Sequence, residues 1–214
     1  MKVWAATALC FLVITFQSPV YAQGQASEPV YGIIFEQDVE IVTRDGTTLR
    51  ADIYRPDVAG DFPVLMSLSV YQKSLDRVLP HEPPFTHVER PEPDFWTPRG
   101  YILAFVDSRG TGTSSGQSDI WSMQEAYDYY DAIEWAGAQS WSNGSVGLIG
   151  VSYYAITQWN VAGLQPPSLK TIVPWEGWAD MYRDSVFHGG LFNQGFYGRW
   201  WLDVRGKQLL ENQR

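Results

Sequence analysis

The segment at residues 146–155 holds the pattern with the clearest chemical potential, a serine two positions after a glycine. An apolar run that predicts a buried strand leads into Gly150, and Tyr153 begins a run that predicts a helix. A serine on such a tight strand-to-helix turn exposes its hydroxyl above the sheet, as in a nucleophile elbow. The backbone of this turn is strained, so a small residue is needed at position 150. The sequence therefore predicts Ser152 as a nucleophile, with a structural serine as the alternative.

The same turn could stabilise the negative charge that develops on a carbonyl oxygen during acyl transfer. The helix beginning at Tyr153 would direct its first amide N–H groups at that oxyanion. The usual five-residue motif also has glycine two positions after the serine, where this chain has Tyr154. The motif is incomplete, so the prediction depends on the strand before it and the helix after it.

The elbow and three other segments resemble the cocaine esterase and X-prolyl dipeptidyl-peptidase family of serine hydrolases. The similarity covers roughly residues 35–200. The four segments are specific to the family when taken together, although none of them is specific alone. The resemblance implies an α/β-hydrolase fold, no cofactor or metal, and hydrolysis of acyl esters or short peptides through a serine acyl-enzyme. The matching segments are Gly150-Val151-Ser152-Tyr153-Tyr154-Ala155-Ile156-Thr157-Gln158-Trp159, Asp107-Ser108-Arg109-Gly110, Asp131-Ala132-Ile133-Glu134-Trp135 and Asp180-Met181-Tyr182-Arg183-Asp184.

The resemblance also implies further site residues. The family carries a tyrosine hydroxyl as a second oxyanion donor after an early strand, and Tyr71 matches that position, beside the backbone N–H of Tyr153. Relatives that hydrolyse α-amino acyl esters hold the substrate ammonium with carboxylates, and Asp184 resembles one of these. The alternatives are a packing role for Tyr71 and an ion pair between Asp184 and Arg183 or another cap residue. The family often has glycine at Ala155, a departure expected to affect helix packing more than chemistry.

The sequence offers no obvious base for Ser152. Serine hydrolases of this fold carry their Asp and His after later strands, and too few residues follow Trp175 for those strands. His81 and His87 lie in a Pro-rich loop, and His188 follows the nucleophile instead of preceding it as the oxyanion loop of lipases does. We therefore expect the front portion of a longer hydrolase, inactive by itself and ending inside a helical cap.

The predicted elements alternate between strand and helix. A hairpin turning at Asp45-Gly46 precedes buried strands over 62–70, 101–106, 146–149 and 169–173, with helices over 125–136 and 153–162. This order predicts an α/β fold with a parallel sheet and an antiparallel hairpin at its start, truncated before the last strands. We expect Asp128 on the solvent face of its helix, and Asp107 anchoring its loop through Arg109. The predicted divisions are a flexible lead-in (23–34), the hydrolase part (35–177) and the start of the cap (178–214).

Two other classes of function compete with a hydrolase. The glycine loop at 110–116 could suggest a dinucleotide site, but its spacing is Gly-x-Gly-x-x-x-Gly and no helix follows at once. A non-catalytic binding protein, or an inactive truncated homologue, could use its tryptophans as an aromatic surface. The candidate tryptophans are Trp175, Trp178, Trp200 and Trp201.

The N-terminus predicts export. Residues 1–22 combine Lys2, an apolar run and a small residue at Ala22, which is typical of a secretory signal peptide. The run is shorter than the ~20 residues of a membrane span, so no stable anchor is expected. Cleavage after Ala22 would remove Cys10, and a thiol-free chain suits a periplasmic or extracellular protein. The net charge of −9 argues against nucleic acid as a partner, and the oligomeric state is left open.

Overall fold

Six strands form one mixed sheet in the computed structural model, which describes residues 26–74, 89–202 and 206. The strand order is β1-β2-β4-β3-β5-β6. The β1–β2 and β2–β4 pairs are antiparallel, whereas β4, β3, β5 and β6 run parallel. The predicted parallel sheet with an antiparallel hairpin at its start is therefore confirmed. The strands are β1 (Ile33–Val42), β2 (Thr48–Pro56), β3 (Phe62–Ser69), β4 (Ile102–Asp107), β5 (Ser142–Val151) and β6 (Leu169–Trp175).

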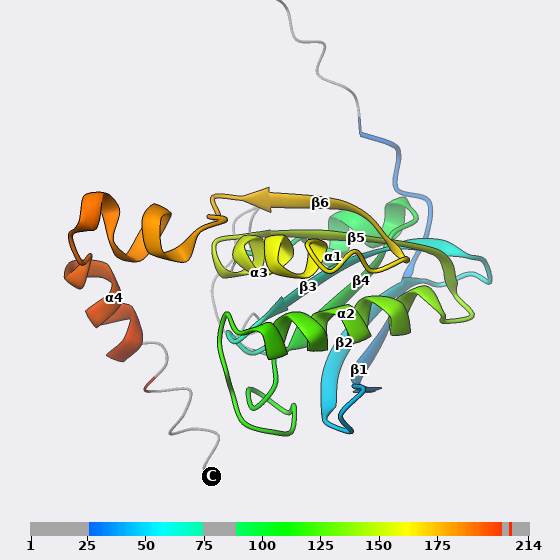
Figure 1. Cartoon of the computed structure of the whole chain (residues 1–214). Helices are drawn as coiled ribbons and strands as arrows, with labels where there is room; N and C mark the ends of the chain where they lie inside the picture. The colour runs from blue at the N-terminus through cyan, green and yellow to red at the C-terminus, as the bar shows by residue number, and fades with distance from the viewer. Residues whose placement is uncertain (1–25, 75–88, 203–205, 207–214) are drawn as a thin grey trace, which may run out of the picture.

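Helices cover both faces of this sheet. α2 (Met123–Gly137) and α3 (Tyr153–Ala162) lie in front of it in Figure 1, and they bury the larger apolar core against the strands. A smaller cluster occupies the other face, where Trp96 of α1 (Pro93–Trp96) packs near Leu103 and Phe105. The 3₁₀ turn η2 (Thr97–Arg99) follows α1 and leads into β4. The sheet is thus a rigid layer between two sets of helices, a suitable base for a site at its edge.

Two predicted burial patterns are wrong. β6 was expected to be a buried strand, but three of its 7 residues are exposed and none is buried, because it pairs only with β5 within the described part of the chain. At this edge Pro174 can pair with Gly150, since the strand needs no N–H donor on its outer side. Asp128 was expected on the solvent face of α2, but it is buried.

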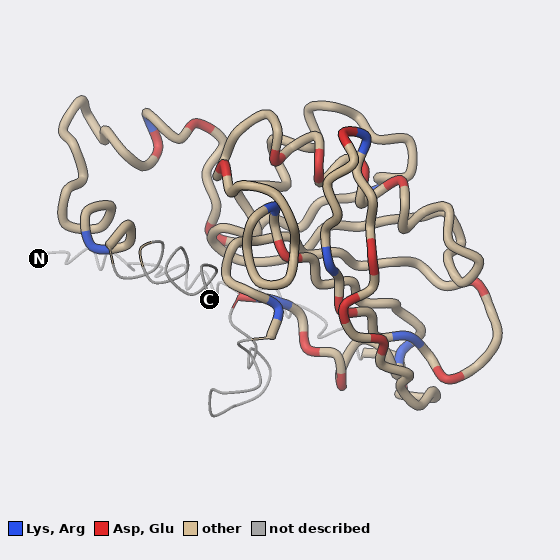
Figure 2. The backbone as a smooth tube through the Cα atoms, turned by 90° about the horizontal axis from the view of Figure 1, so that it is seen from below, with Lys and Arg blue, Asp and Glu red and all other residues tan. Residues whose placement is uncertain are grey.

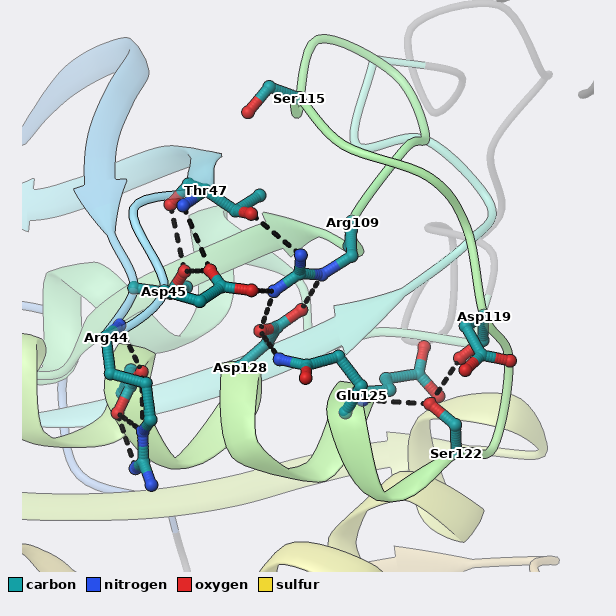
Figure 3. A network of polar contacts seen from close by, with 12 residues as sticks. Arg44, Asp45, Thr47, Arg109, Ser115, Asp119, Ser122, Glu125 and Asp128 are labelled. Carbon is teal, nitrogen blue, oxygen red and sulfur yellow. Dashed lines mark hydrogen bonds and ion pairs between the residues drawn. The ribbon is translucent and has the colours of Figure 1, made fainter.

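The burial of Asp128 has a partner that explains it. Arg109 hydrogen-bonds both Asp128 oxygens, at 2.6 and 2.8 Å, and reaches Asp45 in the β1–β2 turn at 2.7 Å. Figure 3 shows the guanidinium between these two carboxylates. Arg109 therefore ties the hairpin to α2. The expectation that it holds Asp107 is wrong, because Asp107 contacts Lys73 instead.

Short helical segments follow the sheet. The π-helix η3 (Met181–Val186), the 3₁₀ turn η4 (His188–Gly190) and α4 (Gln194–Trp200) lie beyond the carboxyl ends of the parallel strands, at the left of Figure 1. They fall in the range predicted as the start of a cap. His81, His87 and the predicted signal peptide lie outside the described residues.

Charge and hydropathy add two further observations. Figure 2 shows acidic residues spread over many loops and strand ends, not gathered on one face. No helix in the described part of the chain is both long and apolar enough to cross a membrane.

Candidate active site

Ser152 occupies the sharp turn between β5 and α3. Its backbone has φ 57° and ψ −117°, a conformation that costs a non-glycine residue about 1–3 kcal/mol. Hydrogen bonds hold the turn in place: the Ser152 N–H donates to the carbonyl of Trp175 at 3.0 Å, and the Ser152 carbonyl accepts from Ala155 and Ile156. The surrounding structure therefore enforces the strain that places this serine at the start of a helix.

Gly150 is required by this turn, as the sequence predicted. Its φ of 153° is unfavourable for other residues, and a Cβ there would lie 2.4 Å from the Cβ of Tyr154. The same Cβ would lie 3.2 Å from the carbonyl oxygen of Glu89. Any larger residue at position 150 would push α3 away from β5.

Burial accommodates both Tyr154, which departs from the five-residue elbow motif, and Ala155, which departs from the family pattern. The Tyr154 side chain is buried and hydrogen-bonds Ser69, and burial raises the pKa of its phenol to about 12. Ala155 is fully buried, and a Cβ at Gly177 would lie 2.6 Å from the Ala155 Cβ. The extra methyl group at Ala155 is therefore matched by a glycine opposite it.

Tyr71 and Ser152 line the same small cavity. The Tyr71 oxygen accepts a hydrogen bond from Trp200 Nε1 at 3.2 Å. Burial, followed by the nearby Glu89 carboxylate, raises the pKa of Tyr71 to about 12, so the phenol stays protonated and able to donate. Its ring also packs on Tyr153, with centroids 5.7 Å apart.

A buried lysine holds the loop that carries Tyr71. The Lys73 N–H and Nζ donate to the two oxygens of Asp107, at 2.6 and 3.0 Å, and Nζ also reaches Asp38 at 2.6 Å and Thr113 at 2.8 Å. Burial opposes the charge of Lys73, but Asp107 and Asp38 offset it and raise the pKa of the ammonium. The backbone two residues after Tyr71 is thus fixed to the end of β4. The sequence gave no signal for this cluster.

Glu89 is a site residue that sequence reasoning missed. Its carbonyl accepts from the Val151 N–H at 2.9 Å, which holds the residue next to the elbow. Burial raises the pKa of this carboxyl to about 7, and the nearby carboxylate of Glu176 adds to the shift. A titratable residue from a loop distant in the sequence is therefore bound beside the elbow.

Aromatic side chains cover the serine. Trp121 stacks on Tyr153 and Trp200, with centroids 5.4 and 5.2 Å apart. The space left beside Ser152 is about 10 Å³, close to the volume one water needs. On the other side of Trp121 lies an apolar cavity of about 440 Å³. Its lining includes Met181, Val186, Phe192, Tyr197 and Trp201.

Glu125, in the first turn of α2, positions two members of this cover. It accepts hydrogen bonds from the Tyr153 phenol at 2.7 Å, from Ser108 at 2.9 Å and from the Trp121 N–H at 2.8 Å. Figure 3 shows Glu125 beside Ser122, whose hydroxyl caps the helix. Through Glu125, α2 thereby fixes the ring of Tyr153, the residue that follows Ser152.

The two remaining candidates have only local contacts among the described residues. Asp184 is exposed and accepts from the Asp180 N–H at 3.1 Å, while Arg183 pairs with Asp180, so the expected Asp184–Arg183 ion pair is wrong. His188 is exposed, and its ring contacts the main-chain oxygen of Asp184. Within the described ranges no cluster of three His, Cys, Asp or Glu side chains could hold a metal ion.

Comparison with known proteins decides the family. The profile of the X-Pro dipeptidyl-peptidase (S15) family matches residues 45–214. The chain belongs to this S15 family. The resemblance stated from the sequence is therefore confirmed, and the fold is that of the α/β-hydrolases.

Several known proteins are similar to this chain over most of its length. It is 34% identical to the cocaine esterase of a Rhodococcus species over 146 residues, which are 68% of this chain and 24% of that protein. A CocE/NonD family hydrolase from Staphylococcus aureus superposes with a TM-score of 0.75 at 45% identity, covering 84% of this chain and 34% of that one. An aminopeptidase from a marine sediment thaumarchaeon reaches a TM-score of 0.60 at 25% identity over 83% and 31% of the two chains. This chain thus spans about a quarter to a third of the relatives' length.

Proposed function

We propose that this S15 chain carries the nucleophile and the oxyanion site of a serine hydrolase that cleaves small acyl esters or short peptides. The observation that carries the proposal is the position of Ser152, strained at the start of α3 and lining one small cavity with Tyr71. Attack by Ser152 on a carbonyl carbon would form a tetrahedral oxyanion. Its collapse would release the alcohol or amine and leave an acyl-serine, which water then hydrolyses.

Two donors are placed to stabilise that oxyanion. The Tyr71 phenol lines the small cavity at Ser152 and stays protonated, because burial raises its pKa to about 12. The N–H of Tyr153 belongs to the first helical residue after Ser152, where the dipole of α3 favours negative charge. One such donor is typically worth about 3–4 kcal/mol of transition-state stabilisation.

The substrate class follows from the relatives and from the cover over Ser152. The relatives include a cocaine esterase and an aminopeptidase, so esters and peptides are both candidates. The described aromatic side chains leave room for about one water at the serine. Binding of an acyl group would therefore require Trp121 or Trp200 to move.

Labelling with a fluorophosphonate probe tests the nucleophile. The probe should add one phosphonyl group per chain, located at Ser152 by peptide mass spectrometry, and Ser152→Ala should abolish it. Ser140→Ala is a matched control, since Ser140 is exposed in the turn before β5. Labelling that persists in Ser152→Ala would reject the proposal.

We also propose that the protein is exported, with cleavage after Ala22. The support is the short apolar run between Lys2 and Ala22. Expression in a bacterial host with N-terminal sequencing of the periplasmic fraction tests it. A first residue of Gln23 is the expected result, and an intact Met1 in the cytosol would contradict it.

A further inference from the structure

One hydrogen bond joins the helical segments after the sheet to the loop that carries Tyr71. Trp200, the last residue of α4, places its Nε1 3.2 Å from the Tyr71 oxygen, although the two positions are 129 residues apart in the sequence. Both side chains line the small cavity that contains Ser152. A residue from the range predicted as the start of the cap therefore contacts the candidate oxyanion donor directly.

The chemistry of the two groups fixes the direction of this bond. An indole N–H can only donate, so the Tyr71 oxygen accepts from Trp200 and its own proton points elsewhere. The other hydroxyl oxygens in the cavity lining belong to Ser152 and to Tyr153, whose phenol is bonded to Glu125 at 2.7 Å. The acceptor left in this lining for the Tyr71 proton is Ser152 or, during acyl transfer, the oxyanion formed there.

Ring stacking supports Trp200 at this bond. Its ring lies 5.2 Å from that of Trp121 with an angle of 19° between the planes, and 6.5 Å from that of Tyr153 with an angle of 20°. The indole of Trp121 lacks a comparable bond, since its Nε1 is buried without a hydrogen-bond partner among the described residues. When an acyl group enters, we therefore expect Trp121 to be displaced and Trp200 to stay bonded to Tyr71.

We propose that Trp200 is a positioning residue that directs the Tyr71 phenol toward the oxyanion. This inference rests on the proposed function, in which Ser152 is the nucleophile and Tyr71 an oxyanion donor. A phenol that accepts a hydrogen bond is polarised by it and becomes a stronger donor, because neighbouring bonds in a chain reinforce one another. Trp200 acts through Tyr71, so the placement of α4 is coupled to the rate of acylation.

The rate of fluorophosphonate labelling at Ser152 measures this coupling, because the phosphoryl oxygen of the probe takes the place of the oxyanion. Trp200→Phe keeps an aromatic ring but removes the donor, and it should slow labelling about threefold to tenfold, the worth of one hydrogen bond between neutral groups. In a Tyr71→Phe background the same substitution should cost nothing further, since the phenol through which it acts is gone. Trp201→Phe removes the same atoms from the next residue, which is exposed, and should leave the rate unchanged.

A spectroscopic signature separates positioning from a general loss of structure. In protein labelled with carbon-13 at the ζ carbon of its tyrosines, the Tyr71 resonance is assigned by its absence from Tyr71→Phe. It should shift in Trp200→Phe and stay in place in Trp201→Phe. If Trp200→Phe does not fold, 3-benzothienylalanine at position 200 keeps the bicyclic ring and replaces the N–H with sulfur. This analogue should give the same shift and the same loss of rate.

The outcomes distinguish this inference from the proposed function. An unchanged labelling rate in Trp200→Phe, an equal loss in the Tyr71→Phe background or an unshifted Tyr71 resonance would overturn the positioning role and leave the nucleophile standing. An equal loss in Trp201→Phe would assign the effect to the aromatic cover as a whole and would overturn it as well. Labelling retained in Ser152→Ala, or absent from the wild-type chain, would reject the proposed function and this inference with it.

Discussion

Replacing Lys73 with methionine should destabilise the protein more than any surface substitution. Methionine has a similar length but no charge, so Asp107 would lose the buried ammonium that it pairs with. The side chains of Asp107 and Asp52 are both 2% exposed, and Lys73 Nζ lies 3.0 Å from Asp107 and 3.9 Å from Asp52. Removing one partner of a buried ion pair costs about 3–5 kcal/mol, because the other charge stays buried.

That loss predicts a large change in thermal stability. A domain of this size loses about 2–4 °C of Tm per kcal/mol, so Lys73→Met should melt roughly 6–20 °C lower at neutral pH. Burial already raises the pKa of Asp107, and loss of Lys73 would raise it further. The folded state would then hold the proton more tightly than the unfolded state. The defect should therefore be full at neutral pH and shrink as the pH falls toward the ordinary carboxyl pKa of 3.8.

Circular dichroism melts of single and double variants provide the assay. Asp107→Asn removes the other partner, and the double variant should lose less than the two single losses combined, by about 0.5–3 kcal/mol. Lys170→Met is a matched control, since this lysine bonds only the nearby Pro167 carbonyl among the described contacts and is exposed. A Lys73→Met melt within about 1 kcal/mol of the wild type, or strictly additive losses, would refute the reasoning.

Three further outcomes are expected. Tyr71→Phe should lower the rate of Ser152 acylation about 10²–10³-fold with little change in Tm, because it removes one oxyanion donor; a loss of a fewfold in stopped-flow ester kinetics would return Tyr71 to a packing role. Gly150→Ala should cut the yield of folded protein, since its Cβ would lie 2.4 Å from that of Tyr154, and a wild-type melt would contradict this contact. Asp184→Asn should raise KM for esters with a free α-amino group and leave KM for matched esters without one unchanged, if this carboxylate binds the ammonium. Equal effects on both esters would assign Asp184 to its local bond with the Asp180 N–H.

The elbow could be predicted because its signal is local. Gly150 and Ser152 lie within one strand-turn-helix unit, and the period of the apolar residues changes there. The role of Tyr71 as an oxyanion donor was predicted from the family resemblance. Its place beside Ser152 depends on β3 and β5 being neighbours in the sheet.

Glu89 and Lys73 could not be predicted for a physical reason. Each acts through a contact between distant segments: Glu89 with the elbow, and Lys73 with Asp107 at the end of β4. Nothing in the spacing of charges in a Pro-rich loop shows which carboxylate faces inward. The burial of β6 was mispredicted for a related reason, since an apolar run does not reveal whether a strand has one neighbour or two.

The contact between Ala155 and Gly177 has a consequence for related sequences. A Cβ at position 177 would come within 2.6 Å of the Ala155 methyl group, so the two positions share room for a single methyl. A relative with glycine at the position of Ala155 can carry alanine at the position of Gly177. The side-chain sizes at these two positions should therefore covary among related sequences. In this chain Gly177→Ala alone should be poorly tolerated, whereas adding Ala155→Gly should restore the fold by moving the methyl from the helix to the segment after the edge strand.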